Sequence, residues 1–247
     1  MRAEVRHQLK QDRFSKVTMQ AAEKTVHWSA EHKLKIIIGA ALLLAIGGGG
    51  FFTWYWLNQQ DQKASLELTQ AVRIMDTPLR PANMPAEPEQ ASFASARERA
   101  TRAQDQLKLI VEEYPHTRSA EFAGYFLGVT ALDMGDDAAA TRQFKTAADS
   151  HNSDLASLAK MALASLYRSQ HQDKQAIDLY NQLIAKPSDT VSKATAQIGL
   201  AETYEAGGQP AEAKRIYAQI QKENPTSAVA QLAQEKLQAL NKPVTAQ

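Results

Sequence analysis

The chain of 247 residues contains no cysteine. This absence excludes a disulfide framework, cysteine-ligated zinc, iron–sulfur clusters and thiol catalysis. It is compatible with an exported domain that avoids oxidation, and equally with a cytosolic domain, so it assigns no compartment. An excess of charge of one sign is also lacking. The formal net charge is +1, which gives no overall attraction to nucleic acid or to an acidic surface.

Charge is missing altogether from one long stretch, because no charged residue occurs between Ile36 and Gln60. As a helix, residues 36–57 would be ~33 Å long, which matches the ~30 Å hydrocarbon core of a bilayer. Trp54, Tyr55 and Trp56 stand at the far end, where aromatic rings favour the headgroup region. The stretch therefore predicts a single transmembrane helix over residues 34–57.

Two other interpretations compete with a membrane anchor, namely a buried core helix and a cleaved signal peptide. A core helix rarely runs this long without a polar face. A signal peptide has a shorter leader than 33 residues, and no small-x-small cleavage site follows Leu57. The run Gly47 to Gly50 is either tolerated in lipid or offers a small-residue surface to another helix.

The distribution of basic residues predicts the orientation of this helix. Lys and Arg accumulate on the cytoplasmic side of a membrane, and here they lie before the span, whereas the flank after it offers Lys63 and then Arg73. Residues 1–33 are predicted to be a cytoplasmic basic arm, either an amphipathic helix on the inner leaflet or a flexible solvated arm. His27, Glu31 and His32 are close enough on a helix to suggest a metal pair, but three isolated polar residues beside a membrane do not require one. The basic residues before the span are Arg2, Arg6, Lys10, Arg13, Lys16, Lys24, Lys33 and Lys35.

The segment after the span divides into two parts. Ala64, Leu68, Ala71, Val72 and Met75 recur at helical spacing, so residues 58–75 predict an amphipathic stalk that continues the membrane helix. Residues 76–92 contain four prolines, which exclude a helix. This part predicts a semi-rigid or disordered spacer, with an extended length of up to ~50 Å.

The remainder of the chain repeats itself with offsets of 36 and 37 residues, a period typical of stacked helical hairpins. Residues 93–241 are therefore predicted to form an all-α solenoid. A terminal helix over 227–241 would cover its open end, and residues 242–247 would be frayed. The repeated positions are Ala103, Leu107, Ile110 and Tyr114-Pro115 in a partial first unit; Leu127, Gly128, Ala131, Ala140, Phe144 and Ala147 in the second; Leu163, Ala164, Tyr167, Ala176, Tyr180 and Leu183 in the third; and Leu200, Ala201, Tyr204, Ala213, Tyr217 and Ile220 in the fourth.

The repeated residue types predict how the two helices of each hairpin pack. Small residues such as Gly128 let the first helix approach the second, and the rings of Phe144, Tyr180 and Tyr217 fill the space that the small residues leave. Pro210 suits the first position of a helix, where its missing N–H costs nothing.

The small-x-x-x-aromatic spacing resembles the tetratricopeptide repeat, although the consensus Trp of the first helix is missing, with Gly124, Lys160 and Gln197 near that position. The whole plan is a basic arm, one span, a stalk and degenerate repeats. Over residues 30 to 240 this plan resembles the bacterial YfgM-like family, the ancillary subunits of the SecYEG translocon. The long proline-rich insert departs from the short members of that family.

No catalytic grouping is recognisable, since the chain has no HExxH, no Gly-rich phosphate loop and no GxSxG. His116, His151 and His171 fall in predicted turns between helices. Asp136 and Asp137 precede a predicted helix, where carboxylates cap the N-terminus. We therefore predict that the protein is not an enzyme and needs no cofactor or metal ion.

What remains is a surface for partners. In tetratricopeptide-like stacks the first helix of each hairpin lines a concave groove, and its mixture of apolar and charged residues would suit a peptide. The alternative is that Phe122, Met161 and Ile198 are ordinary core residues. The resemblance implies these groove residues: Phe122, Tyr125, Val129, Leu158, Met161, Ser165, Arg168, Thr195, Ile198, Glu202 and Glu205.

Two functions follow as expectations. The first is a periplasmic, membrane-anchored scaffold or chaperone-like adaptor that binds protein partners or emerging secretory clients near the Sec translocon. The second is a structural envelope-assembly protein that links two folded complexes without handling unfolded clients. The sequence does not choose between them.

Overall fold

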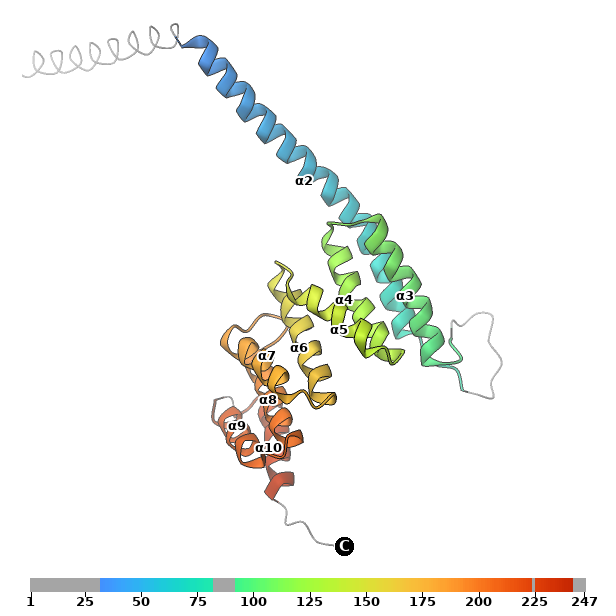
Figure 1. Ribbon diagram of the computed structural model, residues 1–247, viewed down its shortest axis with the longest axis vertical. Coiled ribbons are helices and arrows are strands. Elements are labelled where there is room, and N and C mark those ends of the chain that lie inside the picture. Colours follow the sequence, from blue (N-terminus) through green and yellow to red (C-terminus); the bar gives the residue numbers. More distant parts are fainter. Residues whose placement is uncertain (1–31, 82–91, 224, 242–247) are drawn as a thin grey trace, which may run out of the picture. The chain divides into compact units, whose positions relative to one another are not determined.

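The computed structural model describes residues 32–81, 92–223 and 225–241. The predictions for residues 1–31, including the basic arm with His27 and Glu31, and for the tail 242–247 lie outside the described residues. Within the described ranges there is no strand, apart from one isolated β-bridge between Leu79 and Phe93. The helices are α2 (Lys33–Asp76), α3 (Ala96–Glu113), α4 (Arg118–Asp133), α5 (Asp137–Ala148), α6 (Ser153–Ser169), α7 (Asp173–Ala185), α8 (Lys193–Ala206), α9 (Pro210–Glu223) and α10 (Ala228–Asn241) (Figure 1).

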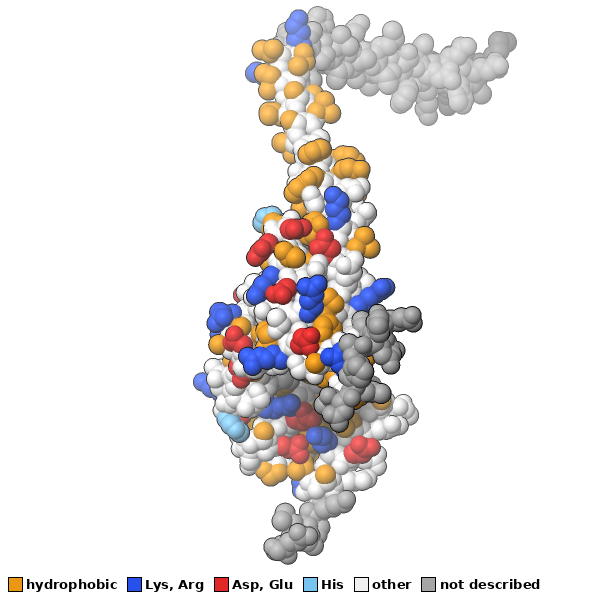
Figure 2. Space-filling model, turned by 90° about the vertical axis from the view of Figure 1, so that its right-hand side faces the viewer, with side chains coloured by type: hydrophobic (Ala, Val, Ile, Leu, Met, Phe, Trp, Pro, Cys, Tyr) orange, Lys and Arg blue, Asp and Glu red, His pale blue; other side chains and the backbone are white. Residues whose placement is uncertain are grey.

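The chain forms two compact units, Met1–Leu57 and Asn58–Gln247, and the boundary between them falls within α2. In the first unit none of the described side chains is buried, and hydrophobic side chains gather along the helix (Figure 2). Leu44 is 77% exposed and Ile46 is 71% exposed. By length and composition alone, α2 is the one described helix that is able to cross a membrane.

The glycine run inside this unit keeps its helical conformation. The hydroxyl of Thr53 donates a hydrogen bond to the carbonyl of Gly49 at 2.9 Å. A Cβ atom added at any residue from Gly47 to Gly50 would meet nothing within 4 Å. This part of the helix therefore offers open space to a neighbour.

The second unit is a stack of helical hairpins, which confirms the predicted solenoid. We call α4, α6 and α8 the A helices and α5, α7 and α9 the B helices. Each A helix contacts its own B helix and the helix that precedes it in the chain, and α10 covers the last hairpin (Figure 1). Consecutive A helices also contact one another, whereas among α3 to α10 no two B helices do. The A helices therefore line the inner side of the stack.

The predicted insertion of aromatic rings against small residues is confirmed. Phe144, Tyr180 and Tyr217 are fully buried. A Cβ atom on Gly128 would lie 2.6 Å from Cε1 of Phe144, so only glycine permits this approach. Gly199 of α8, which the sequence pattern did not single out, permits a similar approach between two hairpins, because its Cβ would lie 2.3 Å from Cε1 of Tyr180 on α7.

The predicted stalk over residues 58–75 is not separate from the repeat domain. Ala64 and Ala71 have no exposed surface and share a buried cluster with Leu107 and Ile110 of α3 and with residues of α4. The second half of α2 is thus the first helix of a hairpin with α3. The repeat domain was predicted over residues 93–241, and in the structure this preceding helix belongs to the same compact unit. The sequence period does not reveal the helix, because no short turn connects it to α3.

Hydrogen bonds join this half of α2 to the helices beside it. The backbone N–H of Ser119 donates to the carboxylate of Asp61 at 2.8 Å. The hydroxyl of Tyr114 donates to Glu67 at 3.0 Å. Asp61 therefore satisfies an N–H at the start of α4 that the helix itself leaves without a partner.

The described ends of the proline-rich segment contact each other, and no helix forms over residues 77–81, as predicted. The N–H of Arg80 donates to the carbonyl of Phe93 at 2.7 Å, and the N–H of Phe93 donates to the carbonyl of Pro78 at 3.3 Å. The guanidinium of Arg99 binds the carbonyl of Thr77 at 3.0 Å. Both ends of the segment therefore meet, and its span cannot approach ~50 Å.

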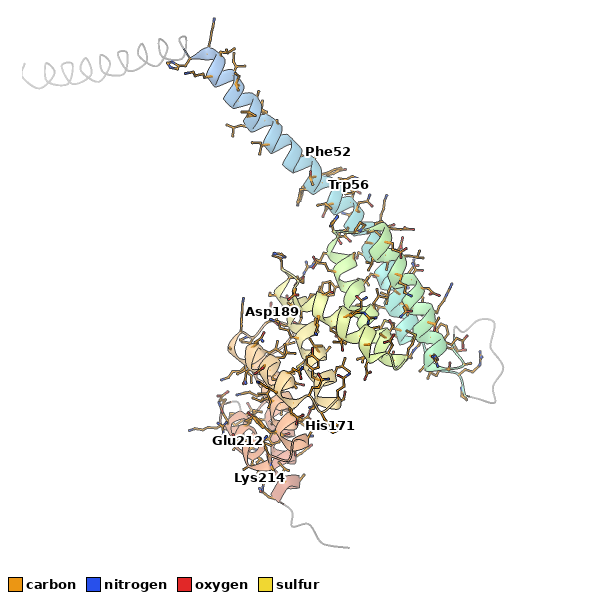
Figure 3. All side chains as sticks on the ribbon, in the orientation of Figure 1. Phe52, Trp56, His171, Asp189, Glu212 and Lys214 are labelled. Atoms are coloured by element: carbon orange, nitrogen blue, oxygen red, sulfur yellow. The ribbon has the colours of Figure 1, made fainter. Side chains whose placement is uncertain are left out.

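The turns between consecutive helices follow the sequence expectations. The carboxylate of Asp136 accepts the N–H of Ala139 at 2.8 Å, which confirms its capping role. Helix α9 begins at Pro210. His116 and His171 occupy turns with φ of 73° and 57°, a left-handed conformation that follows the end of a helix. Figure 3 labels His171.

Two glycines one turn apart on α4 provide a test of this packing. A Cβ on Gly124 would meet only Oε1 of Gln143 at 4.0 Å, so Gly124→Ala should stabilise the fold by ~0.5–1 kcal/mol through helix propensity. Gly128→Ala forces a methyl group against the buried Phe144 ring and should destabilise by ~1–3 kcal/mol. Urea denaturation followed by circular dichroism measures both. Effects of the same sign would contradict the register of α4 on α5.

Candidate functional site

The predicted groove residues lie on the three A helices. Phe122, Tyr125 and Val129 are on α4; Leu158, Met161, Ser165 and Arg168 are on α6; Thr195, Ile198, Glu202 and Glu205 are on α8. We call this set the A-helix face. Ile198, at 9% exposed, belongs to the buried core, which is the alternative that the sequence left open for it. Thr195 is exposed, and the other members are half-buried.

The apolar members form a strip that rests on the core. Tyr125, Val129, Leu158 and Met161 all pack against the main buried cluster while keeping part of their surface accessible. The ring of Tyr125 lies 5.6 Å from that of Phe144. Burial raises the pKa of the Tyr125 hydroxyl, so this side chain stays neutral at physiological pH. The strip can therefore contact an apolar partner without having to repack.

The charged members are joined in a cluster that sequence reasoning did not anticipate. The carboxylate of Glu202 forms ion pairs with Arg168 of α6 and, at 3.0 Å, with Lys236 of α10. Burial raises the pKa of the Glu202 carboxyl, but the hydrogen bonds and charges of Arg168 and Lys236 outweigh this effect and lower it below its ordinary value. One carboxylate therefore ties three helices together.

Hydroxyl groups of the B-helix rings extend the same network. The Tyr217 hydroxyl donates to Glu205 at 2.9 Å. Burial, and to a smaller extent this hydrogen bond, raises the pKa of Tyr217. The hydroxyls of Tyr180 and Ser165 lie 3.2 Å apart. These rings fill the core with their bodies, and they reach the A-helix face with their oxygen atoms.

Lys236 is the member that the sequence did not indicate. It lies three residues after the buried Ala233 and one before the half-buried Leu237, so its helical position points to a place near the core. The sequence interpretation treated α10 only as an apolar cover. Its contribution to the face requires knowledge of which helix lies beside α8.

The side chains of the face are suited to binding contacts. In the part of the chain that the structure describes, no three His, Asp or Glu side chains come together to hold a metal ion. Glu202 is already neutralised by two cations, so the charged end is less available to a partner than the sequence suggested. The apolar strip is the part of the face whose side chains keep accessible surface for a partner.

Comparisons with known proteins agree with this architecture. The family model of the tetratricopeptide repeat-like domain matches residues 26–242. A candidate kinesin light chain of Podosopora anserina, whose TPR-like repeats are nearly identical, has a similar fold with a TM-score of 0.55 at 16% identity, over 73% of this chain and 86% of that one. A single-residue variant of the same protein has a TM-score of 0.55 at 16% identity, over 73% of this chain and 85% of that one. No curated protein matches the chain significantly.

The ion pairs of Glu202 generate a pH-dependent prediction. Because its pKa is lowered on folding, the carboxylate stabilises the fold above its unfolded pKa, near 4.5, and this contribution is lost as the pH falls through the folded value. Glu202→Gln should therefore lower the free energy of unfolding by ~1 kcal/mol at pH 7, with a smaller difference below about pH 4.

Thermal unfolding between pH 3 and pH 7 measures this effect. The matched control is Glu235→Gln, which removes an exposed carboxylate on α10 that has no ion pair among the described residues. A deficit of Glu202→Gln that stays constant over the whole pH range would show that the carboxylate charge is not what holds α6, α8 and α10 together.

Proposed function

The chain belongs to the tetratricopeptide repeat-like domain family, and from this premise we propose that it is a membrane-anchored, non-catalytic scaffold that binds polypeptide partners. The observation that carries the proposal is the A-helix face, where half-buried apolar side chains lie on the inner side of a helical stack. Such a strip presents several anchors at helical spacing, which suits an extended or helical segment.

The anchor is the first half of α2. Its apolar side chains have no protein to pack against in the described residues, and apolar surface left in water costs ~25 cal/mol per Å². A lipid bilayer removes this cost over the whole circumference of the helix. Phe52 and Trp56 lie near its end (Figure 3), where aromatic side chains favour the membrane interface.

The orientation follows from the basic residues that precede the span. With these on the cytoplasmic side of a bacterial inner membrane, the repeat domain is periplasmic. The resemblance to the YfgM-like family supports partners at the SecYEG translocon, either translocon components, periplasmic chaperones or emerging secretory chains. A scaffold that links two folded envelope complexes is the alternative.

The contact between residues 78–80 and Phe93 restricts how such a scaffold works. The anchor ends at Leu57 and the repeat domain begins at Asn58, so no spacer residues separate them along the chain. Attachment to the membrane raises the effective concentration of the binding face for anything that emerges at that surface. Capture is therefore local.

Orientation is tested with single cysteines, since the chain has none of its own. A membrane-impermeant thiol reagent applied to intact spheroplasts should label Ala218→Cys, on the exposed side of α9, and spare Ser15→Cys. Both should react after detergent treatment. The opposite labelling pattern in intact spheroplasts would reverse the proposed topology.

The binding face is tested by photo-crosslinking in cells. A photoreactive residue at Thr195 or Met161 of the A-helix face should yield adducts, whereas the same residue at Ala218 of α9 should yield few. Mass spectrometry of the adducts separates unfolded secretory chains from one folded partner, and so separates the two functions. An equal yield of adducts at Ala218 would show that binding is not confined to the A-helix face and involves the B helices.

A further inference from the structure

Two cavities lie at equivalent places in successive repeats. One, of about 230 Å³, is bounded by the end of α5, the start of α6 and the end of α7. The other, of about 310 Å³, lies beside Gly124 one repeat earlier. Both are lined by Asp149, Ser150 and His151, so they adjoin. They occupy the position where Gly124 and Lys160 replace the consensus tryptophan.

The next repeat shows what this position holds when it is filled. The 230 Å³ cavity is lined by Lys160, Gln182 and Lys186. The residues 37 positions later in the next repeat are Gln197, Gln219 and Glu223. There the carboxylate of Glu223 accepts hydrogen bonds from Gln219 at 2.8 Å and from Lys193 at 3.0 Å. A carboxylate from within the chain therefore occupies the site.

In the preceding repeat the carboxylate is replaced by a cation. Lys160 and Lys186 both line the 230 Å³ cavity, and in the described part of the chain neither ammonium group forms an ion pair. Gln182 is retained as a donor, and Ser153 at the start of α6 also lines the cavity, where the helix dipole favours an anion. Asp149 is the one acidic residue in the lining, and it is exposed, as are Gln182 and Lys186. The cavity therefore keeps the counterpart of Gln219 and has Ala156 in place of Lys193, while Lys160 and Lys186 supply the positive charge.

We propose that this cavity binds an acidic side chain of a partner polypeptide, with its carboxylate in the place that Glu223 takes in the next repeat. The neighbouring cavity is lined by Val111, Ala120 and Ala147 and has open space at Gly124. It accepts an apolar side chain adjacent to the acidic one. The site is formed by helix ends and the α5–α6 turn, and it does not depend on the A-helix face.

The test uses the full-length chain in detergent micelles and three fluorescein-labelled peptides, with binding measured by fluorescence anisotropy. The first has blocked ends and the sequence Gly-Ser-Phe-Glu-Glu-Gly-Ser. The second replaces both glutamates by glutamine. The third ends in a free carboxylate after Phe-Gln-Gln. The acidic peptide should bind about tenfold or more tightly than the glutamine peptide, since it alone supplies charge-assisted hydrogen bonds.

The variant Lys160→Gln with Lys186→Glu gives the cavity the residues that the next repeat has at these two positions, so it places the chain's own carboxylate where the partner's would bind. It should lose the preference for the acidic peptide while its helical circular dichroism and Tm stay unchanged. The control Lys145→Gln with Lys174→Glu makes the same change in net charge at exposed positions outside the cavity, and should bind like the wild type.

Three results would overturn the proposal. The first is equal binding of the acidic and glutamine peptides to the wild-type chain, which needs no variant. The second is equal loss of binding in the cavity variant and in the control, which would show general attraction to positive charge. The third is binding of the free-carboxylate peptide alone, which would assign the cavity to chain termini.

Discussion

The contact between a buried ring on one helix and a glycine or alanine on its neighbour is the interaction on which the repeat domain depends. Phe144, Tyr180 and Tyr217 have no exposed surface, and the space they fill exists only because residues such as Gly128 and Gly199 lack a Cβ atom. This contact sets the distance between helices within and between hairpins. It also determines that the tyrosine hydroxyls emerge near Ser165 and Glu205, so the core and the A-helix face are built from the same side chains.

The period of the sequence predicted the hairpins from α4 to α9 and the covering helix α10, because each of their contacts joins segments that are close along the chain. The first hairpin could not be predicted in this way. Its helices are separated by residues 77–95. Its first helix is continuous with the long apolar run, so the local sequence pattern indicates an extension of a membrane helix and not the start of a repeat. Asp61 and Ser119 are 58 residues apart, and neither residue type signals the contact.

The sequence predicted which helix face carries the residues of the candidate site, but it did not predict how far each side chain is buried. Residues of the first helix in each hairpin were expected on one face, and α4, α6 and α8 carry them there. Whether a member is accessible depends on how the neighbouring helix crosses it, which separates the buried Ile198 from the half-buried Met161. The pairing of Glu202 with Lys236 depends on the adjacency of α8 and α10, and no spacing in the sequence encodes it.

Degeneracy at a single repeat position gives this stack its chemical variety. A large ring at Gly124, Lys160 and Gln197 would fill all three sites alike. In its absence the first becomes an apolar hollow, the second a cavity with two lysines, and the third a network closed by Glu223 and Lys193. Because each hairpin is held together by its ring and small-residue contacts, this position is free to diverge without loss of the fold. The same backbone unit can therefore offer different chemistry in each repeat.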